Sequence, residues 1–273
     1  MSYKKILTIQ DISCVGQCSL TVALPILSAC GLETCILPSA VLSTHTSGFT
    51  GFTVRDLTDD IPAICNHWLK ENISFDAVYT GYLGSIKQID YVKDIFLKLK
   101  KREGISFVDP AMADNGKLYP AFDNEYVEAM KTLCFCADVV LPNITEACLL
   151  TGIEYKEEYD EAYINDLLNG LKQNGAKTII LTGVGYDKES TGVVVYEKGQ
   201  ISYYKHYRIP RNCHGTGDVY ASAFVGLLLQ GKSTFEAAAV AADYVVKCIE
   251  NTKDDEDHWY GVKFETALGE LIK

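Results

Sequence analysis

The sequence predicts an α/β fold with a mostly parallel central sheet. Short apolar runs alternate with amphipathic segments of about 10–15 residues, the pattern of repeated strand–helix–strand units. Polar clusters follow several of the apolar runs, and parallel strands bring such clusters together at one edge of a sheet. The 273 residues contain no linker, repeat or low-complexity segment, so we expect a single domain, residues 1–273.

The first half of the chain predicts four strands, each followed by a helix. The longest expected helix, residues 85–104, is amphipathic and ends at Gly104. Its last basic residues lie near the negative end of the helix dipole. The expected strands are 4–9, 33–42, 75–82 and 105–110, and the expected helices are 19–31, 61–71, 85–104 and 125–136.

The second half continues the alternation until residue 192. There two β-rich runs surround a turn at 198–200, which predicts an antiparallel addition to the sheet within 192–209. The other expected elements are strands 137–143 and 177–183 and helices 144–152, 164–175 and 218–230. Gly152 is expected to close the helix before it.

Residues 226–233 read GLLLQGKS and fit the GxxxxGKS/T pattern of phosphate-binding loops. Such a loop needs free backbone N–H groups between a strand and a helix. Here the surrounding residues favour a helix that ends at Gly231, followed by a helix capped by Ser233 with Glu236 in a capping box. N–H groups inside a helix cannot hold phosphate, so we interpret this match as structural.

Composition excludes several classes of protein. The net charge is −11 and no run of Lys or Arg is present, so no nucleic-acid partner is expected. No secretory h-region and no stretch of about 18 apolar residues occurs, so no membrane partner is expected either. None of the ten cysteines forms a CxxC pair, which favours reduced thiols and a cytoplasmic location.

The segment CHGTGD, residues 213–218, is the best candidate for chemistry. Gly215, Thr216 and Gly217 open a predicted helix, where free N–H groups and the helix dipole can bind an anion. Asp218 follows in the first turn. It either caps the helix or takes a proton from a hydroxyl group while the turn stabilises a transferred phosphoryl group.

Six segments, in order along nearly the whole chain, resemble the pyridoxal (vitamin B6) kinases of the ribokinase-like superfamily. The resemblance implies a three-layer α-β-α sandwich, a single kinase domain and a homodimer. The segments are ILTIQDISCVGQCSLTVALPILSACG, LSTHTSGFTGF, VYTGYLGS, FVDPAMADNGKLY, LPNITEACLLTG and NCHGTGDVYASAF.

The resemblance implies phosphorylation of a vitamer's 5′-hydroxymethyl group by ATP and Mg²⁺, with a monovalent cation such as K⁺ as a further candidate. Asp218 would be the catalytic base, and Gly215, Thr216 and Gly217 would form the anion hole. The other implied residues are Asp109 and Glu146 for the metal, and Asp114, Tyr119, Asn143, Thr182 and Gly183 for ATP and its phosphates. From the residues alone, Asn143 is also a helix N-cap, and DPAMADNG is a turn-rich loop.

On the substrate side the resemblance implies contacts from Asp11, Ser13, His45, Thr46 and Tyr82. Without it, His45 is a satisfied loop histidine and Tyr82 a core tyrosine. Many pyridoxal kinases carry Ser-His after the first Ile-Gln, whereas this chain has Asp11, more as in the hydroxymethylpyrimidine kinases. A carboxylate here favours a protonated ring nitrogen or an amine-bearing vitamer.

Two other functions stay open, and one is excluded. A hydroxymethylpyrimidine kinase of thiamin biosynthesis is the first alternative, and a non-catalytic ligand-binding member of the fold is the second. An NAD-type oxidoreductase needs GxGxxG after the first strand, but residues 10–19 offer one glycine. The acidic run 253–259 is interpreted as a solvated turn rather than a metal cluster.

Overall fold

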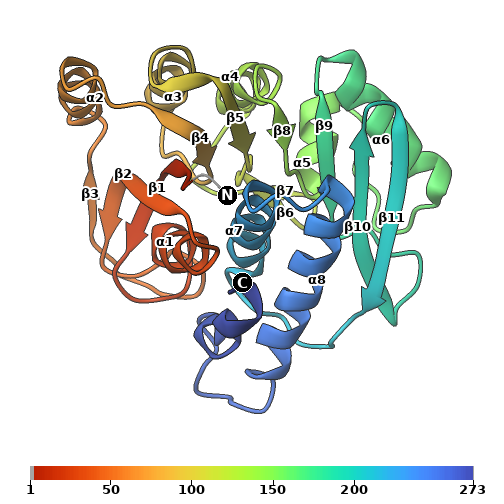
Figure 1. The fold of residues 1–273 in the computed structure, drawn as a ribbon. Coiled ribbons are helices and arrows are strands. Elements are labelled where there is room, and N and C mark those ends of the chain that lie inside the picture. Colours follow the sequence, from red (N-terminus) through yellow and green to blue (C-terminus); the bar gives the residue numbers. More distant parts are fainter. Residues whose placement is uncertain (1–2, 273) are drawn as a thin grey trace.

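The computed structural model describes residues 3–272 and confirms the predicted α/β class. Figure 1 shows a large central sheet with helices on both faces. The strands are β1 Lys5–Ser13, β2 Glu33–Leu42, β3 Val54–Asp56, β4 Phe75–Thr80, β5 Lys100–Val108, β6 Ala113–Asp114, β7 Lys117–Leu118, β8 Val139–Val140, β9 Thr178–Thr182, β10 Ser190–Glu197 and β11 Gln200–Tyr207. The helices are α1 Leu20–Ala29, α2 Ile61–Lys70, α3 Ile86–Lys98, α4 Asn124–Cys134, α5 Ile144–Thr151, α6 Glu161–Gln173, α7 Thr216–Leu229, α8 Thr234–Glu250 and the 3-10 helix η1 Phe264–Leu271.

The main sheet has the strand order β11-β10-β9-β8-β5-β4-β1-β2-β3. Strands β2, β1, β4, β5, β8 and β9 pair in parallel, while β3, β10 and β11 are antiparallel additions. The antiparallel pair predicted within 192–209 is therefore confirmed. Because six strands run the same way, the segments that follow them meet at one edge of the sheet.

Two hydrophobic cores fill the space between the sheet and its helices. Side chains from α2, α3, α4, α5 and α6 pack on one face. Side chains from α1, α7, α8 and η1 pack on the other. Figure 1 shows helices α1, α7 and α8 together on this face. Helix α7 is buried along most of its length, and its N-terminus is thereby held firmly near the sheet.

The helix predicted to end at Gly104 ends at Lys98 instead, so this part of the prediction was wrong. Leu99 is buried at the helix end, and the chain enters β5 at Lys100, which pairs with Phe75 of β4. Sheet pairing therefore overrides the helix propensity of the basic residues. The short strand β3 and the hairpin β6–β7 were not predicted, because each is too short to show a period.

The phosphate-loop match at 226–233 lies where the helix interpretation placed it. Residues 226–229 belong to α7, and Gly231 has the left-handed φ of 101° expected just after a helix end. Ser233 caps α8 and forms the predicted capping box with Glu236. This segment therefore offers no phosphate cradle.

The structure also reports on two expectations from composition. All ten cysteines are free. Across residues 3–272, no helix is both long and apolar enough to span a bilayer.

Helix α7 crosses α1 so closely that Gly226 has room for no side chain. A Cβ at Gly226 would overlap Sγ of Cys30 and lie 2.9 Å from its Cβ. We predict that Gly226→Ala lowers the free energy of unfolding by about 1–3 kcal/mol, measured by thermal or urea unfolding. Gly269→Ala is the control, because its Cβ would meet no atom within 4 Å. Equal stability of the two variants would contradict this packing.

Candidate active site

Most of the predicted site residues gather at the carboxyl edge of the sheet. Asp109 follows β5, and Asn143 follows β8 and forms a β-bridge with Thr182 at the end of β9. Asp11 and Ser13 lie at the end of β1, where the register shifts relative to β2. Strand order places these ends side by side, so the topology assembles the site.

The start of α7 offers three free backbone donors. Gly215 is the N-cap with a left-handed φ of 74°, and no side chain caps the helix. Within residues 3–272, no hydrogen bond engages the N–H groups of Thr216, Gly217 or Asp218, and the helix ladder begins with Val219. A Cβ on Gly215 would overlap the carbonyl oxygen of Gln17, so only glycine allows this close approach. Free N–H groups at a helix start form an anion site.

The Asp218 carboxylate lies beside these donors and does not cap the helix. The backbone of Ser19, which has a positive φ of 56°, interacts with this carboxylate and favours its charged form. Burial, followed by the charges of Asp109 and Asp11, raises the pKa of Asp218 to about 7. A carboxylate with this pKa can both accept and release a proton near neutral pH, as a general base must.

Asp109 and Glu146 form a second acidic pair close to Asp218. The Glu146 carboxylate accepts N–H bonds from Met112 at 3.0 Å and from Asn143 at 2.9 Å. Burial and the neighbouring Glu146 raise the pKa of Asp109, and burial raises the pKa of Glu146. No Lys, Arg or His among the described residues forms an ion pair with Asp109, Glu146 or Asp218.

This unpaired acidic cluster fits Mg²⁺. Its donor atoms are oxygens, and a divalent cation would favour the charged carboxylates that burial and mutual repulsion disfavour. In the part of the chain that the structure describes, no three His, Cys, Asp or Glu side chains are close enough to chelate a metal by themselves. Mg²⁺ is commonly held by one or two carboxylates, waters and substrate phosphates, so the two observations agree.

Asn143 caps the N-terminus of α5, which is one of the two roles predicted for it. Its side chain accepts the N–H of Glu146 and Glu146 reaches back to the N–H of Asn143, a complete capping box. Its amide also donates to the carbonyl of Ala113 at 2.8 Å. Asn143 thus ties α5 to the hairpin β6–β7, and its contact with phosphate stays a prediction.

The hairpin β6–β7 brings Asp114 and Tyr119 towards the acidic cluster. Asp114 is exposed and accepts two hydrogen bonds from Asn115. Burial, then the charges of Glu146, Asp114, Asp109 and Asp218, raise the pKa of Tyr119. Tyr119 is therefore close enough to the acidic cluster to be influenced by its charges. Next to Asn143, Gly183 has open space where a Cβ would be.

On the substrate side, Asp11 lies with Ser13 and Tyr82. Ser13 donates its hydroxyl to Asp11 at 3.0 Å, and both side chains are buried. Burial raises the pKa of Asp11, and interactions with the hydroxyls of Ser19 and Ser13 partly offset the effect. Burial and the charge of Asp11 raise the pKa of Tyr82, so the phenol of Tyr82 lies near this carboxylate.

His45 and Thr46 lie on the loop between β2 and β3. Thr46 is exposed, whereas only 4% of His45 is exposed. His45 Nε2 lies 2.7 Å from the carbonyl oxygen of Tyr260, and Nδ1 accepts the N–H of Ser47 at 3.1 Å. The satisfied loop histidine expected from the residues alone is therefore what the structure contains, and a direct substrate contact of His45 stays a prediction.

Sequence reasoning missed the C-terminal strap, residues 252–265, which was interpreted in part as a solvated acidic turn. Arg211 donates to the carbonyls of Thr252, Asp255 and His258. Gln17 bonds His258 at 2.7 Å and donates to Glu265 at 2.8 Å. The strap therefore connects the loop after β1, the His45 loop and the segment before α7. No sequence signal indicated it, because the contacts join residues more than 40 positions apart.

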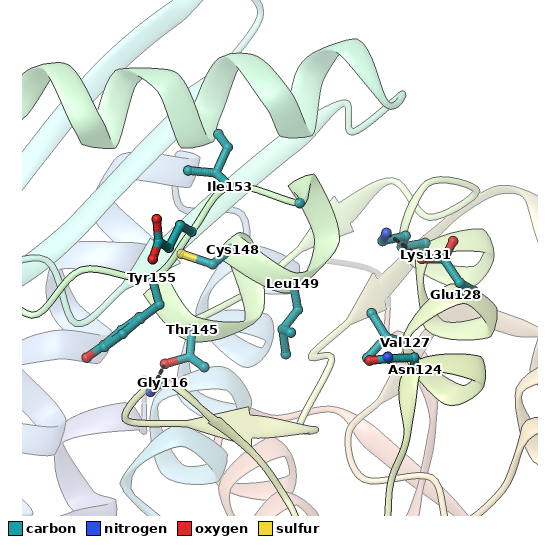
Figure 2. A pocket seen from close by; sticks show the side chains of 12 residues that line it. Gly116, Asn124, Val127, Glu128, Lys131, Thr145, Cys148, Leu149, Ile153 and Tyr155 are labelled. Carbon is teal, nitrogen blue, oxygen red and sulfur yellow. Dashed lines mark hydrogen bonds and ion pairs between the residues drawn. The ribbon is translucent and has the colours of Figure 1, made fainter.

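A separate cavity of about 370 Å³ lies between α4 and α5, outside the acidic cluster. Figure 2 shows Asn124, Val127, Glu128 and Lys131 on one side of it and Thr145, Cys148 and Leu149 on the other. It reaches the β6–β7 turn only through Gly116, whose N–H donates to Thr145 at 2.9 Å. None of the predicted catalytic or substrate residues lines this cavity, so it is separate from the candidate site.

Comparison with known proteins supports a kinase. The family model of the phosphomethylpyrimidine kinases matches residues 24–261. A candidate phosphomethylpyrimidine kinase from Bacteroides thetaiotaomicron is 37% identical, with a TM-score of 0.95 over 99% of this chain and 94% of that chain. A second crystal form of that protein contains pyridoxal. The pyridoxal kinase of Lactobacillus plantarum is 33% identical, with a TM-score of 0.91 over 99% and 97% of the two chains. The pyridoxal kinase of Dictyostelium discoideum is 29% identical over 240 residues, 81% of this chain and 77% of that protein.

The fold and these comparisons define a kinase of the ribokinase-like class. The chain belongs to the phosphomethylpyrimidine kinase family. Several of its relatives are pyridoxal kinases. The resemblance to pyridoxal kinases that its motifs carry is thereby confirmed.

The raised pKa of Asp218 has a consequence for stability. The folded state favours the protonated carboxyl, so the stabilising contribution is full below about pH 4 and is lost as pH rises through about 7. We predict that Asp218→Asn without Mg²⁺ increases the free energy of unfolding by about 2–4 kcal/mol at pH 8 and by less at pH 5. Thermal unfolding at both pH values measures this.

Asp166→Asn, at an exposed position of α6, is the control for a charge change alone. A Tm gain for Asp218→Asn that does not depend on pH, or a loss at pH 8, would contradict the raised pKa.

Proposed function

We propose that this protein transfers the γ-phosphoryl group of ATP, with Mg²⁺, to the 5′-hydroxymethyl group of a vitamin B6 vitamer. One observation carries the proposal: the Asp218 carboxylate, with a pKa raised to about 7, stands beside three free N–H groups at the start of α7. A base next to an anion site is the minimum arrangement for phosphorylating an alcohol. The pyridoxal-bearing crystal form of a 37% identical relative supports the choice of substrate.

In this mechanism Asp218 accepts the proton of the 5′-hydroxyl as its oxygen attacks the γ-phosphorus. The new O–P bond forms while the bond to the β-phosphate oxygen breaks, and ADP leaves. The N–H groups of Thr216, Gly217 and Asp218, together with the positive end of the α7 dipole, bind the oxygens of the transferred group. These donors need no rearrangement, because Gly215 and Ser19 already hold the turn in place.

Asp109 and Glu146 would hold Mg²⁺, in part through water, and Tyr119 would cover the phosphates. When bound, the metal neutralises charge that develops on the phosphate oxygens. Thr182 and Gly183 lie beside Asn143 and would border the nucleotide phosphates. Tyr82 would flank the pyridine ring next to Asp11.

Phosphorylation of hydroxymethylpyrimidine is the second candidate. The name of the matching family and the presence of Asp11 favour it. The two substrates share a hydroxymethyl group on a nitrogen heterocycle, so the phosphoryl-transfer residues would serve either one. The difference lies in the side chains around the ring.

We predict that Asp218→Asn binds ATP within about threefold of the wild type and lowers kcat by roughly 10²–10⁴-fold, because no base then accepts the proton. In the wild type, kcat/KM should decrease as the pH is lowered below about 7, because Asp218 becomes protonated. Steady-state kinetics and nucleotide titration measure these values, with Asp166→Asn as the control. If Asp218→Asn kept a tenth or more of wild-type turnover, another group would have to be the base.

We predict that Asp11→Ser changes the ranking of the vitamers. A buried carboxylate favours an ammonium group over a hydroxyl, so kcat/KM for pyridoxamine should fall about tenfold more than for pyridoxine. The measurement is kcat/KM for pyridoxal, pyridoxine and pyridoxamine in the two proteins. An equal change for all three vitamers would show that Asp11 does not discriminate among their ring substituents.

A further inference from the structure

The ring of His45 has no free nitrogen with which to bind a substrate. A backbone N–H can bond only to an unprotonated ring nitrogen, so the bond from Ser47 fixes Nδ1 as an acceptor. The proton is then on Nε2, which donates to the carbonyl oxygen of Tyr260 at 2.7 Å. A Cβ on Gly16 would overlap Cδ2 of the ring, so the third side is closed as well.

A second imidazole, that of His214, lies against His45. The two ring centroids are 5.6 Å apart and the planes are tilted by 49°. His214 is exposed, and no residue from 3 to 272 makes a hydrogen bond to its ring. Partial burial and the nearby His45 lower the pKa of His214, so at neutral pH the ring is uncharged, with one donor and one acceptor.

His214 stands where three substrate-side segments meet. It directly precedes Gly215, which packs on the carbonyl of Gln17 in the loop after β1. His45, on the β2–β3 loop, lies on the other side, and Asp218 lies in the first turn of α7, which begins just after His214. We therefore expect a heterocycle whose hydroxymethyl group reaches Asp218 to contact the free imidazole of His214.

We propose that His214 is the imidazole that hydrogen-bonds a polar substituent on the ring of the substrate. His45 is then a positioning residue: its hydrogen bonds with Ser47 and Tyr260 fix its ring, and the ring packs against His214. This assignment rests on the proposed function, and it transfers to His214 the substrate contact that the family resemblance placed on His45.

The test compares His214→Phe with the wild type on pyridoxine and on two analogues, one without the 3-hydroxyl group and one without the hydroxyl of the 4-hydroxymethyl group. Phenylalanine keeps the packing on His45 and removes both nitrogens. We expect KM for pyridoxine to rise about 5–30-fold, KM for ATP to stay within twofold, and the penalty to vanish for the analogue that lacks the contacted group. His67→Phe, on the exposed face of α2, is the control.

The variant His45→Phe tests whether His45 positions His214 or contacts the substrate itself. It should lower Tm and kcat, because it breaks two internal hydrogen bonds, but it should keep the wild-type discrimination between pyridoxine and the analogues. An equal penalty of His214→Phe on all three substrates, or none above twofold, overturns the assignment.

The outcome for the wild type separates this assignment from the proposed function. If the wild type phosphorylates only hydroxymethylpyrimidine, the vitamer substrate of the proposed function is rejected. The discrimination of His214→Phe is then measured between hydroxymethylpyrimidine and its analogue without the amino group. Turnover of neither substrate overturns both proposals.

Discussion

Burial of unpaired carboxylates at the carboxyl edge of the sheet is the constraint on which the site depends. Asp11, Asp109, Glu146 and Asp218 come from four different segments, and each has a raised pKa with burial as the largest cause. No ion pair within the described chain neutralises any of them. Such a cluster costs folding free energy, and a cation or a transferable proton relieves it.

The backbone around the cluster is arranged to hold this charge in place. Gly215 allows the start of α7 to touch the loop after β1, and the backbone of Ser19 interacts with Asp218. Asn143 and Glu146 lock α5 to the β6–β7 hairpin by a capping box and a bond to Ala113. Charge, free N–H groups and covering hairpin are thus set by packing before any ligand arrives, which is the condition for electrostatic catalysis.

The sequence predicted the architecture well where local signals are strong. Strand–helix alternation, the capping box of Ser233 and Glu236, and the assignment of GLLLQGKS to a helix end and the next helix start were all correct. Errors arose where long-range contacts decide. Residues 100–104 joined β5 because β4 offered a partner, and the tautomer of His45 depends on Tyr260, which is 215 positions away. The free His214 stood inside the CHGTGD motif, but only the structure distinguishes a free imidazole from a satisfied one.

The central claim is that this site phosphorylates the 5′-hydroxymethyl group of a B6 vitamer. Incubating the purified protein with Mg·ATP and, separately, each vitamer, hydroxymethylpyrimidine and ribose, with product detection by mass, tests it most directly. The account predicts a 5′-phosphate on at least one vitamer and none on ribose. Phosphorylation of hydroxymethylpyrimidine alone would contradict the vitamer assignment while keeping the mechanism, and no product from any substrate would contradict the account of the site itself.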